Sequence, residues 1–222
     1  MDSILYTNSN EEFIKTICKT IQEQATENIK EKGSFTFVLS GGRTPKDIFI
    51  ELALNYRNSI DWRKVHFFWL DERCVEATHE DSNYKLAYDN LLSKLNRVGS
   101  IHRIKGELKP KQAATEYKED LLQFFGMDEV TFDFILLGMG EDGHIASLFP
   151  NSKEINLVGD MVLETERNYN GCGRITLGLN FINRSLCKVL MIKGEEKLKI
   201  LKSGDSAFPV NSLENLNVIG LS

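Results

Sequence analysis

The sequence has 222 residues, of which 41% are hydrophobic and 27% are charged. This balance is typical of a globular protein that buries a sizeable core, and it excludes disordered, collagen-like and disulfide-scaffold chains. Its 27 Lys and Arg against 32 Asp and Glu give a formal net charge of −5, so the chain lacks the positive field of a nucleic-acid-binding protein, although a local basic pocket for a small anion is still allowed.

Strands and helices alternate in the first two thirds of the sequence. Apolar residues recur at three- and four-residue spacing over residues 13–29, after the capping-type run Asn8-Ser9-Asn10, and predict an amphipathic helix that ends at Gly33. Short apolar runs predict strands at 35–39, 65–70 and 132–137. Further helices are predicted from Thr44-Pro45 as cap and first residue, from near Ser82, over 111–125, and as a short stretch ending at Phe149-Pro150.

The second part of the chain has a less regular pattern. Strands are predicted at 161–165 and 174–179 around the turn Asn170-Gly171, and at 188–192 before Gly194 and a short helix. Alternating strands and helices predict an α/β fold, an open, mostly parallel, doubly wound, Rossmann-like sheet with helices on both faces. We expect one domain over residues 1–222, because no linker or low-complexity tract divides the chain.

In such sheets ligands bind beyond the carboxyl ends of the strands, so the loops that follow strands are the candidate sites. The first is LSGGRTP, in which Gly41 and Gly42 allow a tight turn and present backbone N–H groups next to a helix N-terminus. Arg43 adds a cation, and together these groups suit a phosphate. The alternative is a plain strand-to-helix turn, and neither a GxGxxG nor a GxxxxGK[ST] motif is present.

The second loop begins with DER, directly after a buried apolar strand. Asp71 and Arg73 place opposite charges at the rim of the sheet, where they can face a crevice. The alternative is a polar surface turn from Asp71 to Asp81. We assign Asp81-Ser82-Asn83 a mainly structural role as a helix cap.

The third loop, GMGEDGH, follows the strand at 132–137. Its glycines let the chain bend around a ligand, and Asp142 and His144 project from one short turn. Histidine transfers protons near neutral pH, and a neighbouring carboxylate orients its ring, so catalysis is the favoured interpretation over a structural histidine. The other histidines, His66, His79 and His102, have no comparable surroundings, and no HxH or HExxH pattern indicates a metal.

Two basic residues of the second half are further phosphate-binding candidates. Arg174 opens a predicted strand, and Lys197 lies in the first turn of the helix after Gly194. Either one alone could be ordinary surface charge, as the nearby Lys193 and Lys199 illustrate. No GxSxG motif and no cysteine in a nucleophile context is present, so covalent catalysis is disfavoured.

Features that the sequence lacks lead to expectations about the location and the partners of the protein. No apolar run approaches the roughly 18 residues that span a bilayer, and no signal or transit peptide is visible, so we expect a cytoplasmic protein without membrane or nucleic-acid partners. The cysteines, Cys18, Cys74, Cys172 and Cys187, fit no zinc spacing and are expected to be reduced thiols. The sequence identifies no protein partner.

The motifs LSGGRTP, WxxV…DER…DSNY, LLGMGEDGHIASLFP, RITL and GEEK occur in the order seen in 6-phosphogluconolactonases. The sequence resembles that family, within the wider group of glucosamine-6-phosphate deaminases and ribose-5-phosphate isomerases, from about Phe35 to Leu201. The resemblance implies a sugar-phosphate substrate, the hydrolysis of 6-phosphoglucono-1,5-lactone in the oxidative pentose phosphate pathway, and no metal or cofactor.

The resemblance also implies roles for individual residues. His144 would be the general base that activates water, with Asp142 beside it, and Asp71 would position the substrate or that water. The phosphate would be held by Arg73, Arg174 and Lys197, with donors from Gly41, Gly42 and Thr44.

Two other functions are alternatives. A glucosamine-6-phosphate deaminase would have a glutamate where this sequence has Phe149, and usually a tyrosine in place of Arg73. A sugar-phosphate-binding module without catalysis would keep the phosphate loop but would not need Asp142 and His144. The sequence departs from the family pattern at Arg43, where serine is frequent, and in a short C-terminus.

Overall fold

The computed structural model describes residues 4–126, 130–157, 159–169 and 172–221. Its centre is a 7-stranded sheet in the order β1-β10-β9-β6-β2-β3-β5, in which every neighbouring pair is parallel. This confirms the predicted open parallel α/β sheet. The strands, in spatial order, are β1 Ile4–Thr7, β10 Leu216–Leu221, β9 Cys187–Lys193, β6 Phe134–Leu137, β2 Phe35–Leu39, β3 Val65–Trp69 and β5 Ser100–His102.

A second, 3-stranded antiparallel sheet stands at one end of the first, in the order β4-β8-β7. Its strands are β4 Asp71–Arg73, β8 Cys172–Leu177 and β7 Val162–Tyr169. The prediction of a polar loop from Asp71 to Asp81 is wrong at its start, because Asp71–Arg73 pairs with β8. The predicted turn at Asn170-Gly171 lies outside the described residues.

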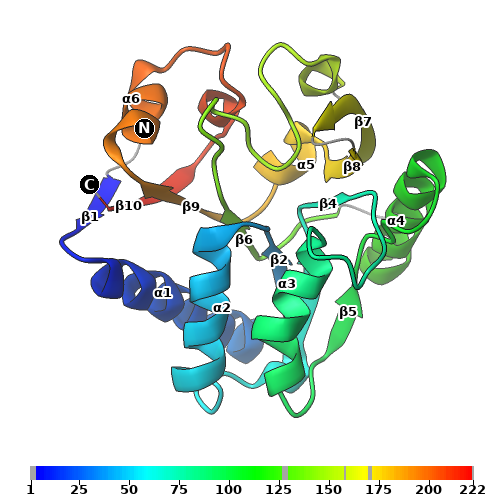
Figure 1. Cartoon of the computed structure of the whole chain (residues 1–222). Coiled ribbons are helices and arrows are strands. Elements are labelled where there is room, and N and C mark those ends of the chain that lie inside the picture. The colour runs from blue at the N-terminus through cyan, green and yellow to red at the C-terminus, as the bar shows by residue number, and fades with distance from the viewer. Residues whose placement is uncertain (1–3, 127–129, 158, 170–171, 222) are drawn as a thin grey trace.

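Helices cover both faces of the parallel sheet. Figure 1 shows α1, α2 and α3 side by side on one face. The connections that carry α4, α5 and α6 run across the sheet in the opposite direction, and right-handed crossovers therefore place them on the other face. The helices are α1 Asn10–Lys32, α2 Arg43–Asn55, α3 Asn83–Asn90, α4 Pro110–Phe125, α5 Leu179–Asn183 and α6 Glu195–Ser203.

The helix ends agree with their local sequence except at α2. Ser9 caps α1, Gly33 ends it in the left-handed region at φ 85°, and Ser82 caps α3. At α2 the N-cap is Gly42 and not Thr44, so Thr44 and Pro45 lie inside the first turn. A proline is tolerated there because the first-turn N–H groups have no partner within the helix.

The predicted helical stretch ending at Phe149-Pro150 is not helical. Gly143 and Ala146 have φ of 80° and 50°, and an isolated bridge joins Ile145 to Leu148. A right-handed helix cannot pass through residues with positive φ. The segment is instead a series of turns that leads away from β6.

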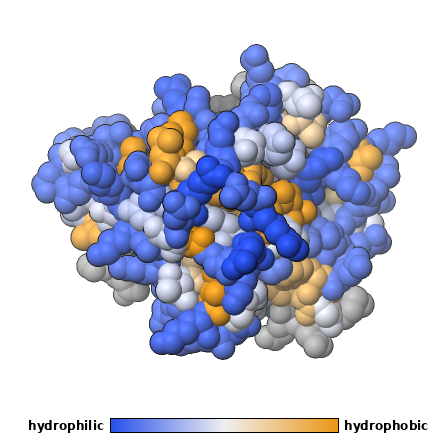
Figure 2. Space-filling model, turned by 90° about the horizontal axis from the view of Figure 1, so that it is seen from below, coloured by the Kyte–Doolittle hydropathy of each residue, from blue (hydrophilic) through white to orange (hydrophobic). Residues whose placement is uncertain are grey.

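The buried apolar side chains form one hydrophobic cluster between the sheet and its helices. On its α1 and α2 side, the rings of Phe35, Phe37, Phe67 and Phe134 pack on one another. The face of the molecule in Figure 2 is mostly hydrophilic, with hydrophobic residues in separate groups. Among the described residues, no helix is both long and apolar enough to span a membrane.

Tyr117 of α4 completes the hydrogen bonding of β3. Strand β5 pairs with β3 only as far as Phe68, so the outward backbone groups of Trp69 have no strand partner there. The Tyr117 hydroxyl donates to the Trp69 carbonyl (2.8 Å) and accepts from the Trp69 N–H (3.0 Å). It therefore holds the chain at the point where β3 passes into β4.

We predict that Tyr117→Phe lowers the free energy of unfolding by about 1–3 kcal/mol, because two buried backbone groups of Trp69 lose their partner. Urea unfolding followed by circular dichroism measures the change. Tyr88→Phe is the matched control, because the Tyr88 side chain is 46% exposed, and it should change stability by less than about 0.5 kcal/mol. Equal stability of the two variants would contradict the prediction.

Candidate active site

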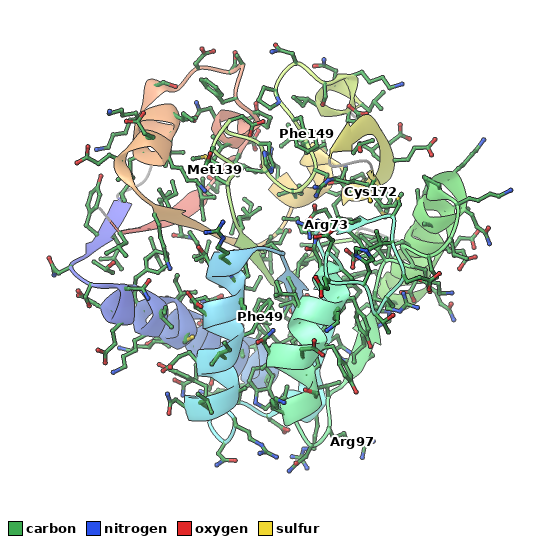
Figure 3. The ribbon with its side chains drawn as sticks, viewed as in Figure 1. Phe49, Arg73, Arg97, Met139, Phe149 and Cys172 are labelled. Atoms are coloured by element: carbon green, nitrogen blue, oxygen red, sulfur yellow. The ribbon has the colours of Figure 1, made fainter. Side chains whose placement is uncertain are left out.

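A cleft of about 420 Å³ opens at the carboxyl ends of the central strands. Its walls are the segments that follow β2, β3, β6 and β9, and between β2 and β6 the strand order changes direction. A switch point of this kind is where open α/β sheets bind ligands. Figure 3 shows Arg73, Met139 and Phe149 in the upper half of the molecule, above α2 and α3.

The glycine pair after β2 forms one wall of the cleft. Gly42 has a φ of 108°, which favours glycine, and its position as N-cap aims the N-terminus of α2 at the cleft. Gly41 lies so close to Asn83 that an added Cβ would be 1.7 Å from Asn83 Oδ1. Only a residue without a side chain fits there.

The antiparallel pairing of β4 with β8 sets the opposite wall. Asp71 and Arg73 alternate with Glu72 along β4, so they face the cleft while Glu72 faces away. The register places Arg73 directly opposite Arg174 of β8. Two guanidinium groups are thereby brought together beside one carboxylate.

The electrostatics of this wall favour a bound anion. Arg174 is 9% exposed and its guanidinium lies 4.0 Å from Asp71. Burial lowers the pKa of Arg174, Asp71 raises it, and the like charge of Arg73 lowers it further. Arg73 donates to the Asp81 carbonyl (2.5 Å). An anion between the two arginines would relieve their repulsion.

Asp71 is buried and held from two sides. The Ser147 hydroxyl donates to its Oδ2 at 2.6 Å, and the Asn83 amide donates to its Oδ1 at 3.2 Å and to its backbone carbonyl at 2.8 Å. Ser147 comes from the loop after β6, and Asn83 from the start of α3. The carboxylate therefore has a fixed orientation at the floor of the cleft.

Glu72, on the other side of β4, anchors α3. Its carboxylate accepts from the backbone N–H groups of Arg73, Asn83 and Tyr84 and from the Ser82 hydroxyl, at 2.7–2.9 Å. Burial raises the pKa of Glu72, and these donors oppose that shift. Because the same contacts fix Asn83, Glu72 supports the Asp71 side of the cleft indirectly.

The loop after β6 presents His144 at the cleft. His144 Nδ1 lies 2.5 Å from Asp142 Oδ1, so the proton on Nδ1 is donated to the carboxylate and Nε2 is left as the acceptor. The ring lies against the Phe149 ring, with centroids 4.7 Å apart. An added Cβ on Gly140 would be 2.1 Å from the ring, so this glycine makes room for the imidazole.

The surroundings of Asp142 favour the ionised form of its carboxylate. Partial burial raises its pKa, but the hydrogen bonds and charge of His144 outweigh burial, so the pKa of Asp142 lies below its usual value. An ionised Asp142 stabilises an imidazolium at His144. Asp142 itself does not line the cleft and acts behind the ring.

Further cations come from β9 and α6. Lys197 donates to the Met139 carbonyl at 2.6 Å, and burial lowers its pKa while Glu141 and Asp142 raise it. Lys193 donates to Asn10 at 2.7 Å. Although the whole chain has a net charge of −5, cations outnumber carboxylates in the cleft. The lining cations are Arg43, Arg73, Arg174, Lys193 and Lys197, against Asp71 and Glu141.

The structure brings together all the candidate residues from the sequence, with Asp142 just behind the cleft lining. Gly41, Gly42, Arg43, Thr44, Asp71, Arg73, His144, Arg174 and Lys197 line it. Ser147 and Lys193 were not predicted from the sequence as site residues, and Asn83 was assigned a capping role only. The DSNY segment, one of the motifs that the sequence shares with the family, is a sequence signal for Asn83, whereas Ser147 acquires its partner Asp71 only through the fold.

Comparison with known proteins shows the family to which the chain is similar. Residues 8–214 match the family described as glucosamine-6-phosphate isomerases/6-phosphogluconolactonase. A "probable 6-phosphogluconolactonase 1" of Arabidopsis thaliana is 38% identical over 91% of this chain and 81% of its own length, and a 6-phosphogluconolactonase of Synechocystis is 38% identical over 82% and 75%. The crystal structure of a 6-phosphogluconolactonase from Shewanella baltica superimposes with a TM-score of 0.86 at 27% identity, over 100% of this chain and 99% of that one.

We predict that Gly41→Ala loses most of the thermal stabilisation that inorganic phosphate gives the unaltered chain, because its Cβ would displace Asn83 and distort the glycine wall. A thermal-shift titration measures the effect. Gly138→Ala is the matched control in the same cleft, since an added Cβ there meets nothing within 4 Å. A phosphate response of Gly41→Ala equal to that of Gly138→Ala would contradict this.

Proposed function

The chain belongs to the glucosamine-6-phosphate isomerase/6-phosphogluconolactonase family, and on that premise we propose that it hydrolyses 6-phospho-D-glucono-1,5-lactone to 6-phosphogluconate in the pentose phosphate pathway. The observation that carries the proposal is the presence in one cleft of an oriented imidazole, His144, and an opposed arginine pair, Arg73 and Arg174. The first suits the hydrolysis of an activated ester, and the second suits a phosphate.

His144 is the general base in this proposal. Its Nε2 takes a proton from a water molecule as the water oxygen forms a bond to the lactone carbonyl carbon. When the tetrahedral intermediate collapses, the bond to the ring oxygen breaks, and the imidazolium returns the proton to that oxygen. The Asp142 carboxylate stabilises the imidazolium between these steps and keeps the ring in the required tautomer.

The phosphate end supplies the positioning. The phosphate dianion lies between Arg73 and Arg174 in this proposal, so the substrate is held by the end that is far from the reacting carbon. Further donors in the same cleft are Lys197, Arg43, the N–H groups of the glycine loop and the Thr44 hydroxyl. Fixing that end converts binding energy into orientation of the lactone carbonyl.

Asp71 has a separate role. Its carboxylate is fixed by Ser147 and Asn83 and lies beside Arg174, so its remaining acceptor capacity faces the cleft. We assign it the positioning of a substrate hydroxyl or of the attacking water. Because an acceptor with a fixed orientation selects one donor geometry, Asp71 also restricts the pose of the lactone ring.

The site does not favour an amino-sugar deaminase. The position that carries a glutamate in deaminases is Phe149, which is buried and packs on the His144 ring. Ring opening of glucosamine 6-phosphate would therefore lack that acid–base group. Release of ammonia from glucosamine 6-phosphate tests this alternative directly, and none is expected.

We predict that His144→Ala lowers kcat about 10²–10⁴-fold with little change in KM, because a general base is lost while phosphate binding remains. The lactone is generated in place from glucose 6-phosphate at mildly acidic pH, and the product is followed with a coupled 6-phosphogluconate dehydrogenase. His79→Ala, at an exposed histidine away from the cleft, is the control. A wild-type rate equal to spontaneous lactone opening would overturn the proposed function.

We predict that Arg73→Ala and Lys197→Ala raise KM about 10–100-fold with a smaller effect on kcat, since a hydrogen bond to a charged group contributes about 1.5–3 kcal/mol. Lys199→Ala is the control, because Lys199 lies exposed on the same helix and pairs with Glu196. Unchanged KM in both cleft variants would remove these residues from the phosphate site.

The cytoplasmic location expected from the sequence stays a prediction.

A further inference from the structure

A second acid–base cluster lies outside the cleft lining, where β5 meets β3 and α4. Its members are His66 of β3, Ser100 and His102 of β5, and Asp120 of α4. Arg97, three residues before Ser100, lies at the lower end of the molecule in Figure 3, whereas Arg73 lies in the upper half. None of the four residues lines the cleft.

The four side chains form a continuous chain of hydrogen bonds. His66 Nδ1 lies 2.7 Å from Ser100 Oγ, and Ser100 Oγ lies 2.6 Å from His102 Nε2. On the other side of the second ring, His102 Nδ1 lies 2.9 Å and 3.0 Å from the two oxygens of Asp120. The parallel register, which pairs His66 with Ser100 and Phe68 with His102, sets this arrangement.

The carboxylate determines where the protons are. Since Asp120 accepts at His102 Nδ1, that nitrogen carries the proton, and His102 Nε2 accepts the proton of the Ser100 hydroxyl. Ser100 Oγ in turn accepts from His66 Nδ1. A serine hydroxyl therefore lies between an imidazole that can remove its proton and a second imidazole that donates to its oxygen and favours the alkoxide.

We propose that Ser100 is a reactive serine, activated by His102 and Asp120, that is acylated by small activated esters. In this step Ser100 Oγ forms a bond to the carbonyl carbon of the ester, and the bond from that carbon to the leaving oxygen breaks. The proton of Ser100 passes to His102 Nε2 and then to the leaving oxygen. Nucleophile, base and orienting carboxylate have the mutual distances that define such a triad.

The position at the sheet edge gives the serine access to small molecules. In the part of the chain that the structure describes, β5 is the last strand of its sheet. Ser100 and both histidines are partly exposed, and the Asp120 side chain is 40% exposed. The Phe68 and Phe124 rings pack against His102, at 4.6 Å and 4.8 Å between centroids, and hold the base in place.

The surroundings of His66 disfavour its charged form. Burial lowers its pKa, His102 lowers it further, and Asp133 raises it to a smaller extent. Asp133 is itself engaged by Lys32 and by the Thr36 backbone N–H. A neutral His66 with its proton on Nδ1 can remain a donor to Ser100 while His102 serves as the base.

The test exposes the folded protein to p-nitrophenyl acetate, followed by tryptic digestion and mass spectrometry. The tryptic peptide of residues 98–103 contains one hydroxyl residue, Ser100, and neither lysine nor tyrosine, so a stable acetyl group in it identifies the serine. We expect acetylation of this peptide at least about 10²-fold faster than that of the tryptic peptide of residues 58–63, in which the exposed Ser59 is likewise the one hydroxyl residue and which also has neither lysine nor tyrosine.

Variants of the cluster distinguish an activated Ser100 from a serine of ordinary reactivity. His102→Gln and Asp120→Asn should lower the labelling of Ser100 about 10²-fold or more, and Ser100→Ala should abolish it. His144→Ala should leave the labelling unchanged, because the cleft is a different site. Lactonase activity and circular dichroism of Ser100→Ala check that the fold is intact. Labelling of Ser100 no faster than that of Ser59, or unaffected by His102→Gln, would overturn the proposal.

Discussion

The pairing of β4 with β8 is the constraint on which the cleft depends. Three residues of β4 alternate, so Asp71 and Arg73 point into the cleft while Glu72 points to the start of α3. A shift of one residue would turn Asp71 and Arg73 away from the cleft and turn Glu72 into it, so the cleft would lose a guanidinium and keep a carboxylate. The four donors on Glu72 resist such a shift, because moving the carboxylate would leave it buried without partners.

The fold also places like charges together at a cost that a ligand can offset. Arg73 faces Arg174 across two antiparallel strands, a pairing that destabilises a sheet when nothing lies between the charges. Asp71 compensates part of this charge, and its oxygens also accept from Ser147 and Asn83. The cleft is therefore arranged for an anion with more than one negative charge, in a chain that is acidic as a whole.

Local sequence was sufficient for the central strands and for the loops that carry His144 and the glycine pair, because strand, glycine turn and helix cap each leave a short-range signal. It was insufficient where an element forms only through pairing with a segment that is far away in the sequence. Strand β4 is three residues long and exists through β8, and the edge strands β1 and β5 and the last strand β10 were not predicted. The positive φ of Ala146, a non-glycine residue, excluded the predicted helix after His144. The contact of Ser147 and the acid–base cluster of His66 and His102 depend on partners far away in sequence.

The Asp142–His144 and Asp120–His102 pairs show how one motif supports different chemistry. In both, a carboxylate holds Nδ1 and directs Nε2 outward. His144 lines a cleft rich in cations, so in the proposed function the partner of its second nitrogen is a water molecule or a substrate group that enters from solvent. At His102, Ser100 already occupies that position at 2.6 Å. The first arrangement suits hydrolysis without a covalent intermediate, and the second suits attack by the protein's own oxygen. The group that Nε2 contacts, rather than the pair itself, determines the reaction.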